Sequence, residues 1–249
     1  MKNLKIKIYG GLSVSENQAK KIITSTEFSN PIQRGDLLKD IRNKTNVVVI
    51  FDGKFEQSLA VSPIEILDAI RSGILIFGAS SMGALRAAEL RNYGMIGHGK
   101  IFELIYNSNV FRDDLLGQVF DENGKSLSLP YIDFYFNGTH YIKLGKIQKP
   151  VFAWLCNHYL RTHYANRTFS NFMSLLNSLK TPKFKFNSTI HAVKLIFSKK
   201  NTQKNVDAIS TLHFVTRHLK QISDYNHKLH GSLQYINSRN IMKLSKHAF

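Results

Sequence analysis

The segment GILIFGASSMGALRAAELRNYGMIGHGKIFE, residues 73–103, gives the clearest indication of the fold. A short apolar run at 74–77 ends at Gly78, and two serines follow before the helix-forming run at 84–90. This order is typical of a strand, a tight turn and a helix. The first N–H groups of a helix lack internal partners and lie at the positive end of its dipole. Such a turn therefore suits a bound anion or carbonyl oxygen, or an exposed serine nucleophile.

The remaining N-terminal sequence predicts more units of the same kind. Residues 4–9 alternate lysine with apolar residues, and residues 47–51 form a continuous apolar run, as expected of a strand buried on both faces. Ser15 is placed to cap one helix, and Ser62-Pro63-Ile64-Glu65 has the pattern of a capping box opening another. Strands separated by helices predict an α/β fold with a doubly wound, Rossmann-like parallel sheet, whose ligands bind beyond the carboxyl ends of the strands.

Charge divides the chain into two regions. Residues 1–140 hold 16 Lys and Arg against 15 Asp and Glu, a balance of +1, whereas residues 141–249 hold 18 against 2, a balance of +16. We therefore expect an α/β core at 1–140 and a basic, mostly helical region at 141–249, with a break near Asn137-Gly138 or Lys149-Pro150. Apolar residues at helical spacing predict helices at about 151–160, 169–179, 190–197 and 206–219, and the tail from 223 to 249 is weakly patterned.

Several separated elements resemble, in order, the signature of the TfuA-like family. The matching elements are Gly35-Asp36, residues 50–55, 65–67, 78–90, 93–97, 101–102 and Asp113-Asp114. The resemblance covers roughly residues 4–120. TfuA-like proteins act beside YcaO proteins in backbone thioamidation of ribosomally synthesised peptides. The resemblance thus implies a YcaO protein and a precursor peptide as partners, with ATP used by YcaO and no cofactor bound directly by this chain. It also implies YcaO activation and sulfur delivery, through hydrolysis of a thiocarboxylated sulfur carrier.

Ser81 and Asp52 are the candidate catalytic residues. Ser81 lies in Ala79-Ser80-Ser81-Met82-Gly83, which is close to the Gly-x-Ser-x-Gly nucleophile elbow but has alanine in place of the first glycine. The simpler role for Ser80 or Ser81 is a helix N-cap, since no histidine can be assigned as a base. Asp52 follows a predicted buried strand, where a carboxylate can act as a base or bind a ligand or a metal, and it is also an ordinary turn residue before Gly53.

Other residues at the turn are candidates for binding a substrate or an anion. Arg86 and Glu89 are three residues apart, so they can form an ion pair, or Arg86 can reach back to an anion at the turn. The candidate set comprises Gly78, Ser80, Met82, Gly83, Arg86 and Glu89. Asp113-Asp114 could bind Mg²⁺, but a lone acidic pair more often caps or solvates a loop, so we expect no metal.

The basic region leaves alternatives open. It could attract an acidic protein, such as a small acidic sulfur carrier, an RNA or a membrane surface. The chain would then be a sulfur-releasing enzyme, a non-catalytic docking and allosteric subunit, or a nucleic-acid-binding protein acting through its basic helices. A single cysteine, Cys156, and the lack of an apparent signal peptide or long apolar segment predict a cytoplasmic protein with no membrane partner.

Overall fold

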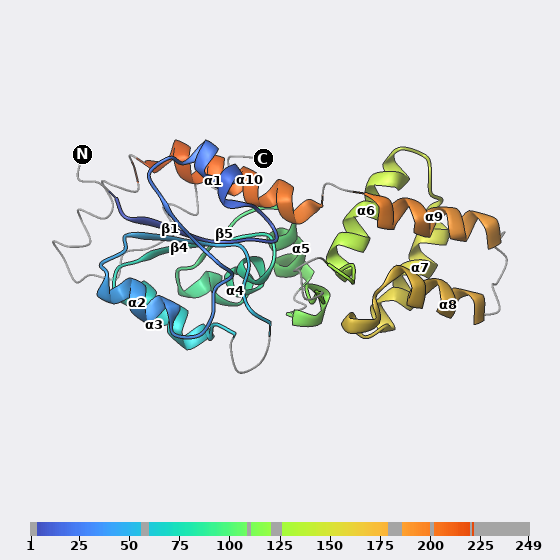
Figure 1. Cartoon of the computed structure of the whole chain (residues 1–249), viewed down its shortest axis with the longest axis horizontal. Coiled ribbons are helices and arrows are strands. Elements are labelled where there is room, and N and C mark those ends of the chain that lie inside the picture. Colours follow the sequence, from blue (N-terminus) through green and yellow to red (C-terminus); the bar gives the residue numbers. More distant parts are fainter. Residues whose placement is uncertain are drawn as a thin grey trace. The chain divides into compact units, whose positions relative to one another are not determined.

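The computed structural model describes residues 4–55, 60–108, 111–120, 126–178, 186–199, 202–219 and 221. The chain divides into two compact units, one formed by Met1–Phe111 with Lys204–Phe249 and the other by Arg112–Gln203. The first is built on a parallel sheet and the second is helical (Figure 1). The predicted fold class, an α/β sheet followed by a mostly helical region, is confirmed.

The sheet has five parallel strands in the order β2-β1-β3-β4-β5. The strands are β1 (Ile6–Tyr9), β2 (Glu27–Ser29), β3 (Val47–Ile50), β4 (Leu75–Gly78) and β5 (Ile96–Gly97). Every residue of β3 and β4 is buried, as their continuous apolar sequences predict. Strands β2 and β5 were not predicted, because a run of two or three residues carries no periodic pattern.

Helices cover both faces of this sheet, which makes it doubly wound as predicted. The helices of the α/β unit are α1 (Glu16–Ile22), α2 (Asp36–Arg42), α3 (Pro63–Arg71), α4 (Met82–Leu90), α5 (Lys100–Ser108) and α10 (Gln203–Arg217), with a 3-10 turn η1 (Arg91–Tyr93) after α4. Helices α1 and α10 lie over one face, and α2, α3 and α4 lie over the other (Figure 1).

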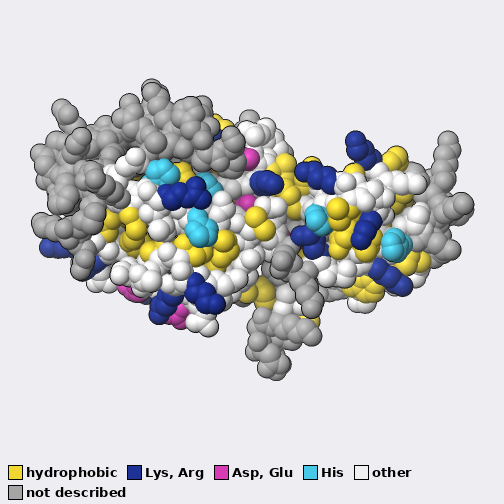
Figure 2. All heavy atoms as spheres, turned by 90° about the horizontal axis from the view of Figure 1, so that it is seen from above, with side chains coloured by type: hydrophobic (Ala, Val, Ile, Leu, Met, Phe, Trp, Pro, Cys, Tyr) yellow, Lys and Arg dark blue, Asp and Glu magenta, His cyan; other side chains and the backbone are white. Residues whose placement is uncertain are grey.

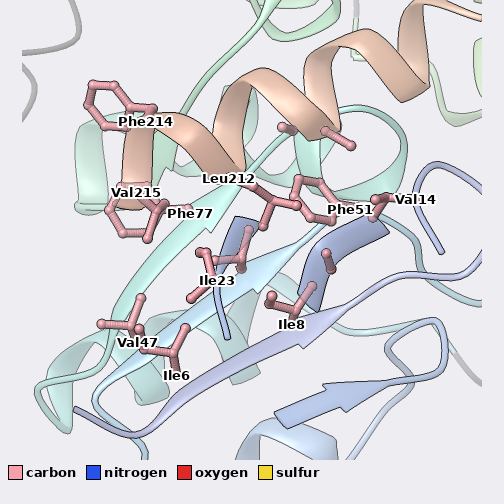
Figure 3. Close-up of a cluster of buried hydrophobic side chains, with 14 of the residues drawn as sticks. Ile6, Ile8, Val14, Ile23, Val47, Phe51, Phe77, Leu212, Phe214 and Val215 are labelled. Atoms are coloured by element: carbon pink, nitrogen blue, oxygen red, sulfur yellow. The ribbon is translucent and has the colours of Figure 1, made fainter. Parts of the chain in front are cut away.

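Helix α10 completes the core of the α/β unit, although it comes from the far end of the chain. Its Leu212 and Val215 are fully buried in one cluster with Ile8 of β1, Val47 of β3 and Phe77 of β4 (Figure 3). This arrangement differs from the division into residues 1–140 and 141–249 that the charge distribution predicted. An apolar stripe fixes a helix in a core, whereas net charge reports mainly on its solvent face.

The second unit has its own aromatic core. Its helices are α6 (Tyr131–Lys143), α7 (Lys149–Arg161), α8 (Phe169–Ser178) and α9 (Phe186–Ser198), with 3-10 turns η2 (Asp113–Leu115) and η3 (Tyr164–Asn166). The ring of Phe134 stacks on Tyr159 with centroids 3.9 Å apart, and Tyr159 meets Phe172 edge-on at 4.7 Å. The helices predicted near 151–160, 169–179, 190–197 and 206–219 are confirmed.

Two further features of the sequence, a predicted domain break and the C-terminal tail, can be compared with the structure. The break considered near Asn137-Gly138 falls inside α6, where Gly138 packs against Phe152 of α7. The weakly patterned tail at 223–249 lies outside the described residues. Within the part of the chain that is described, each helix is too short or too polar to span a bilayer.

The structure contains both predicted helix caps, at Ser15 and at Ser62, but the capping box at Ser62 is incomplete. The Ser15 hydroxyl and Gln18 form a complete capping box at the start of α1. The Ser62 hydroxyl accepts the Glu65 N–H at the start of α3, as predicted. The Glu65 carboxylate, however, accepts the N–H groups of Gly35 and Leu37 at the start of α2. Glu65 therefore links α3 to the preceding helix, α2, instead of closing its own capping box.

Candidate functional site

The carboxyl edge of the sheet brings together the segments that the sequence singled out. The order of the strands reverses between β1 and β3, and ligands of doubly wound sheets bind outside the carboxyl ends of the strands at such a point. Asp52 follows β3 at this edge, the turn from Gly78 to Gly83 follows β4, and His98 follows β5.

Asp52 is buried and fully engaged by the loop that follows β1. Its Oδ2 accepts the N–H groups of Leu12 at 3.0 Å and Ser13 at 2.8 Å, and its Oδ1 accepts the Ser13 hydroxyl at 2.6 Å. Burial raises the pKa of Asp52, and the hydrogen bonds from Ser13 and Leu12 and the charge of Lys204 act against that rise. In this geometry Asp52 holds the β1–α1 loop against β3, and its lone pairs are not open to a substrate.

Gly78 and Gly83 allow strand β4 and helix α4 to approach the neighbouring backbone. A Cβ on Gly83 would lie 1.8 Å from the carbonyl oxygen of Ile50, and a Cβ on Gly78 would lie 2.2 Å from that of Gly83. No side chain fits at either position without moving the backbone. The two glycines, predicted as part of a binding turn, have a packing role that the structure makes explicit.

Ser80 has the unusual backbone of this turn. Its φ is +67°, in the left-handed region that residues other than glycine seldom adopt, and its side chain is fully buried. The Ser80 hydroxyl donates a 2.8 Å hydrogen bond to the carbonyl oxygen of Lys204 in α10. With Gly78 two residues before it, Ser80 fits the start of the elbow pattern better than Ser81 does, but its hydroxyl is committed to α10.

Ser81 and Met82 carry the polar groups of the turn that have no internal partner. Ser81 is half-buried at the N-cap of α4, and its side chain makes no capping hydrogen bond. The N–H groups of Ser81 and Gly83 both donate to the carbonyl oxygen of Phe51, at 3.3 and 3.2 Å. Among the described residues, the Ser81 hydroxyl and the Met82 N–H have no hydrogen-bond partner. One hydroxyl and one adjacent N–H are thus available to a ligand.

Arg86 and Glu89 form the ion pair that their spacing allows. The Arg86 Nη1 lies 2.6 Å from the Glu89 Oε2, and the Arg86 Nε donates to the carbonyl oxygen of Val61 at 3.3 Å. Both side chains are mostly buried. The pair joins α4 to the segment before α3, and neither contact is with the turn.

The structure adds residues to this edge that sequence patterns did not reveal. His98 is buried, its N–H donates to the carbonyl oxygen of Gly78, and its Nδ1 lies 3.1 Å from the Thr211 hydroxyl of α10. Burial lowers the pKa of His98 to about 4, with help from the nearby charges of Arg217 and His218. The buried Asp207 of α10 accepts the Ile101 N–H at the start of α5. In the sequence, Asp207 stood out only because it is one of two acidic residues in the basic region.

The acidic pair at 113–114 is engaged within the helical unit. The Asp114 carboxylate accepts hydrogen bonds from Arg112 at 2.8 Å and from the fully buried Arg167 at 3.0 Å. Burial opposes ionisation of Asp114, but these arginines outweigh it and lower the pKa. The described residues include no group of three or more His, Cys, Asp or Glu side chains placed to hold a metal ion.

Together, these features define a doubly wound α/β unit with a strand–turn–helix candidate site at its carboxyl edge, and a second, helical unit. Residues 52–168 match the model of the family described as TfuA-like protein, which confirms the predicted resemblance over this segment. The match begins at Asp52, takes in the whole turn, and runs past residue 120 to include Arg167. Proteins of this family are associated with YcaO thioamidation systems, in which they act with a YcaO partner. No curated protein matches the chain.

Proposed function

We propose that the turn from Gly78 to Gly83 binds the thiocarboxylate of a sulfur carrier and promotes its hydrolysis, supplying sulfide to a YcaO partner. The observation that carries the proposal is the adjacent pair formed by the Ser81 hydroxyl and the Met82 N–H, neither of which has a hydrogen-bond partner among the described residues. In enzymes with a nucleophile elbow, the N–H of the residue after the nucleophile stabilises the oxyanion. Met82 stands in that relation to Ser81.

The chemistry needs a donor for a developing negative charge. Water, or Ser81 followed by water, adds to the thiocarboxylate carbon, and the charge that develops on oxygen lies toward the Met82 N–H and the positive end of α4. Collapse breaks the carbon–sulfur bond. The balanced outcome is R–COS⁻ + H₂O → R–COO⁻ + HS⁻ + H⁺. The sulfide then becomes the nucleophile that YcaO, which consumes the ATP, directs to a precursor peptide.

The proposal assigns no cofactor to this chain. Lys204 of α10 is a buried cation whose charge acts on Asp52 and whose carbonyl oxygen accepts the Ser80 hydroxyl. Helix α10 thus holds the Ser80 hydroxyl and helps to fix the backbone of the turn. Preorganised donors of this kind contribute most to catalysis when they need no rearrangement as charge develops.

The decisive experiment is thioamidation by the YcaO partner with ATP and precursor peptide, supplied with either free sulfide or a thiocarboxylated carrier. Ser81→Ala is expected to slow the carrier-dependent reaction by about 10- to 100-fold, because one catalytic contact is lost, and to leave the sulfide-dependent reaction unchanged. Ser62→Ala, which removes a capping hydroxyl on α3, is the matched control and should leave both reactions intact. Equal rates for Ser81→Ala and wild type with the carrier would refute the proposal.

A second candidate function is a non-catalytic docking and allosteric subunit of YcaO. The full engagement of Asp52 and the burial of His98 favour it, because neither group is offered to Ser81 as a base. In that case the chain accelerates thioamidation equally from both sulfur sources, and Ser81→Ala has no effect on either.

A further inference from the structure

The helical unit carries a polar groove that plays no part in the sulfur chemistry above. Its cavity volume is about 540 Å³, and it lies where the end of α7 meets η3 and α8. The lining side chains are His158, Arg161, Thr162, His163, Asn166, Asn171, Ser174 and Leu175. All but Leu175 are polar, and none is acidic.

The polar groups that line the groove are available to a ligand. Arg161, Asn166, Asn171 and Ser174 are exposed, and their side chains make no hydrogen bond with another described residue. Neither does the Arg161 guanidinium form an ion pair within the described chain. A guanidinium, two side-chain amides and a hydroxyl therefore converge on one open cavity. Each can donate a hydrogen bond to a carboxylate or to a peptide carbonyl.

The surroundings of the groove attract negative charge. Residues 134–203 contain 11 Lys and Arg and no Asp or Glu. Lys, Arg and His side chains are distributed over the visible face of the helical unit, at the right of Figure 2. Because this segment has no acidic side chain that would repel a negatively charged partner, its net positive charge attracts such a partner at long range. The groove then orients the partner at short range.

An acidic peptide fits these observations better than a nucleic acid. Among the described residues that line the groove, Arg161 is the one Lys or Arg. Burial and the charge of Arg161 lower the pKa of His158. Binding of RNA or DNA draws its affinity from contacts with many phosphates and from bases stacked on exposed aromatic rings. Phe134, Tyr159 and Phe172 of the helical unit are buried in its core, and the exposed Phe169 does not line the groove. The described residues that line the groove include no aromatic ring other than its two histidines.

We infer that the groove between α7 and α8 is a docking site for an acidic, extended segment of a partner protein, with one partner carboxylate paired to Arg161. The amides of Asn166 and Asn171 then bind the peptide backbone or further carboxylates, and Leu175 supplies an apolar contact. An acidic sulfur carrier is one protein that would offer such a segment. The inference does not depend on sulfide release at Ser81.

The test is fluorescence anisotropy with the full chain and a short fluorescein-labelled peptide rich in Asp and Glu. Arg161→Gln is expected to weaken binding by about tenfold, the loss expected for one charge-assisted hydrogen-bonded pair. Asn171→Ala, on a different helix, is expected to weaken it by about threefold. Lys143→Gln removes the same charge from an exposed position outside the groove and is expected to change the affinity by less than about twofold.

Three results would overturn the inference. One is equal weakening by Arg161→Gln and Lys143→Gln, which would show attraction by net charge alone. Another is undiminished binding when the Asp and Glu of the peptide are replaced by Asn and Gln. The third is tighter binding of a single-stranded RNA of similar length that is lost in Arg161→Gln, which would make the groove a nucleic-acid site.

Discussion

The hydroxyl of Ser80 donates a 2.8 Å hydrogen bond to the carbonyl oxygen of Lys204, across 124 positions of sequence. Nearby, the Asn205 amide donates to the carbonyl oxygen of Ser13, and Asp207 accepts from Ile101. The first turns of α10 therefore contact the segments that follow β1, β4 and β5. A helix from the end of the chain holds the ligand edge of the sheet in place.

Ser80→Ala should destabilise the α/β unit. The variant removes the buried hydrogen bond from Ser80 to the Lys204 carbonyl, and the loss of one such hydrogen bond costs about 0.5–1.5 kcal/mol. Ser81→Ala, one residue away, removes a hydroxyl without an internal partner and should change stability by less than about 0.5 kcal/mol. Urea-induced unfolding of the three proteins measures the difference. Equal stability of the two variants would mean that the hydrogen bond from Ser80 to α10 contributes nothing.

Gly83→Ala should prevent the turn from forming. The new Cβ would overlap the carbonyl oxygen of Ile50, so α4 has to move away from β3 at a cost on the order of 3 kcal/mol or more. Gly73→Ala is the control, because a Cβ there meets nothing within 4 Å and only the positive φ of +90° resists it. We expect that control to cost roughly 1–2 kcal/mol. Thermal unfolding distinguishes the two, and a Gly83→Ala protein as stable as the Gly73→Ala protein would contradict the packing described here.

Arg167→Gln should be far more damaging than Arg112→Gln, although both arginines bind Asp114. Arg167 is fully buried and also donates to the carbonyl oxygens of Thr162 and Leu160, so its loss removes several part-buried hydrogen bonds at once. Breaking a buried pair of this kind costs about 3–5 kcal/mol, whereas Arg112 is about half exposed and should contribute less than about 1 kcal/mol. The loss of far-ultraviolet circular dichroism on heating provides the measurement. Similar midpoints for the two variants would refute the assignment.

His98 should make the α/β unit sensitive to acid. Its pKa falls from 6.5 to about 4 on folding, so the unfolded chain binds the proton more readily. The stability that neutral His98 confers is complete above about pH 6.5 and is lost as the pH falls from there toward about 4, by about 2 kcal/mol between pH 7 and 5. His98→Gln should remove that part of the pH dependence. The urea midpoints of the wild type and the variant at pH 7 and pH 5 test this prediction. An equal loss of stability between the two pH values in both proteins would contradict the role of His98.

Local patterns predicted much of the fold because they report on local physics. The apolar run at 47–51 was sufficient to identify a strand buried on both faces, and Ser15 with Gln18 closed the helix cap that sequence spacing allows. The strand–turn–helix segment at 73–103 placed Ser81 at the start of α4. In each case the residues that interact lie within a few positions of one another, so their spacing alone carries the information.

The candidate site was only partly predictable, since its hydrogen bonds join distant segments. The sequence identified Asp52, Ser80 and Ser81 as candidates. It did not show that Ser13 binds Asp52 or that Ser80 binds the Lys204 carbonyl. Nor did it show that the Ser81 side chain makes no capping hydrogen bond. Likewise, Glu65 matched a capping box but binds the N–H groups of α2. A side chain's local pattern shows which bonds it is able to make, and competition with the rest of the fold decides which ones form.

By itself, the sequence determined that this chain builds a parallel α/β sheet with a polar turn at its carboxyl edge and a basic helical region. The tertiary structure decided that α10 belongs with the sheet and that the helices from α6 to α9 form a separate unit with a polar groove. The physical reason is that burying the apolar side chains of α10, including Leu212 and Val215, stabilises the helix against the sheet. The basic charge of the surrounding sequence does not determine where the helix packs. Which face a helix buries is a property of its surroundings, and those are assembled only when the chain folds.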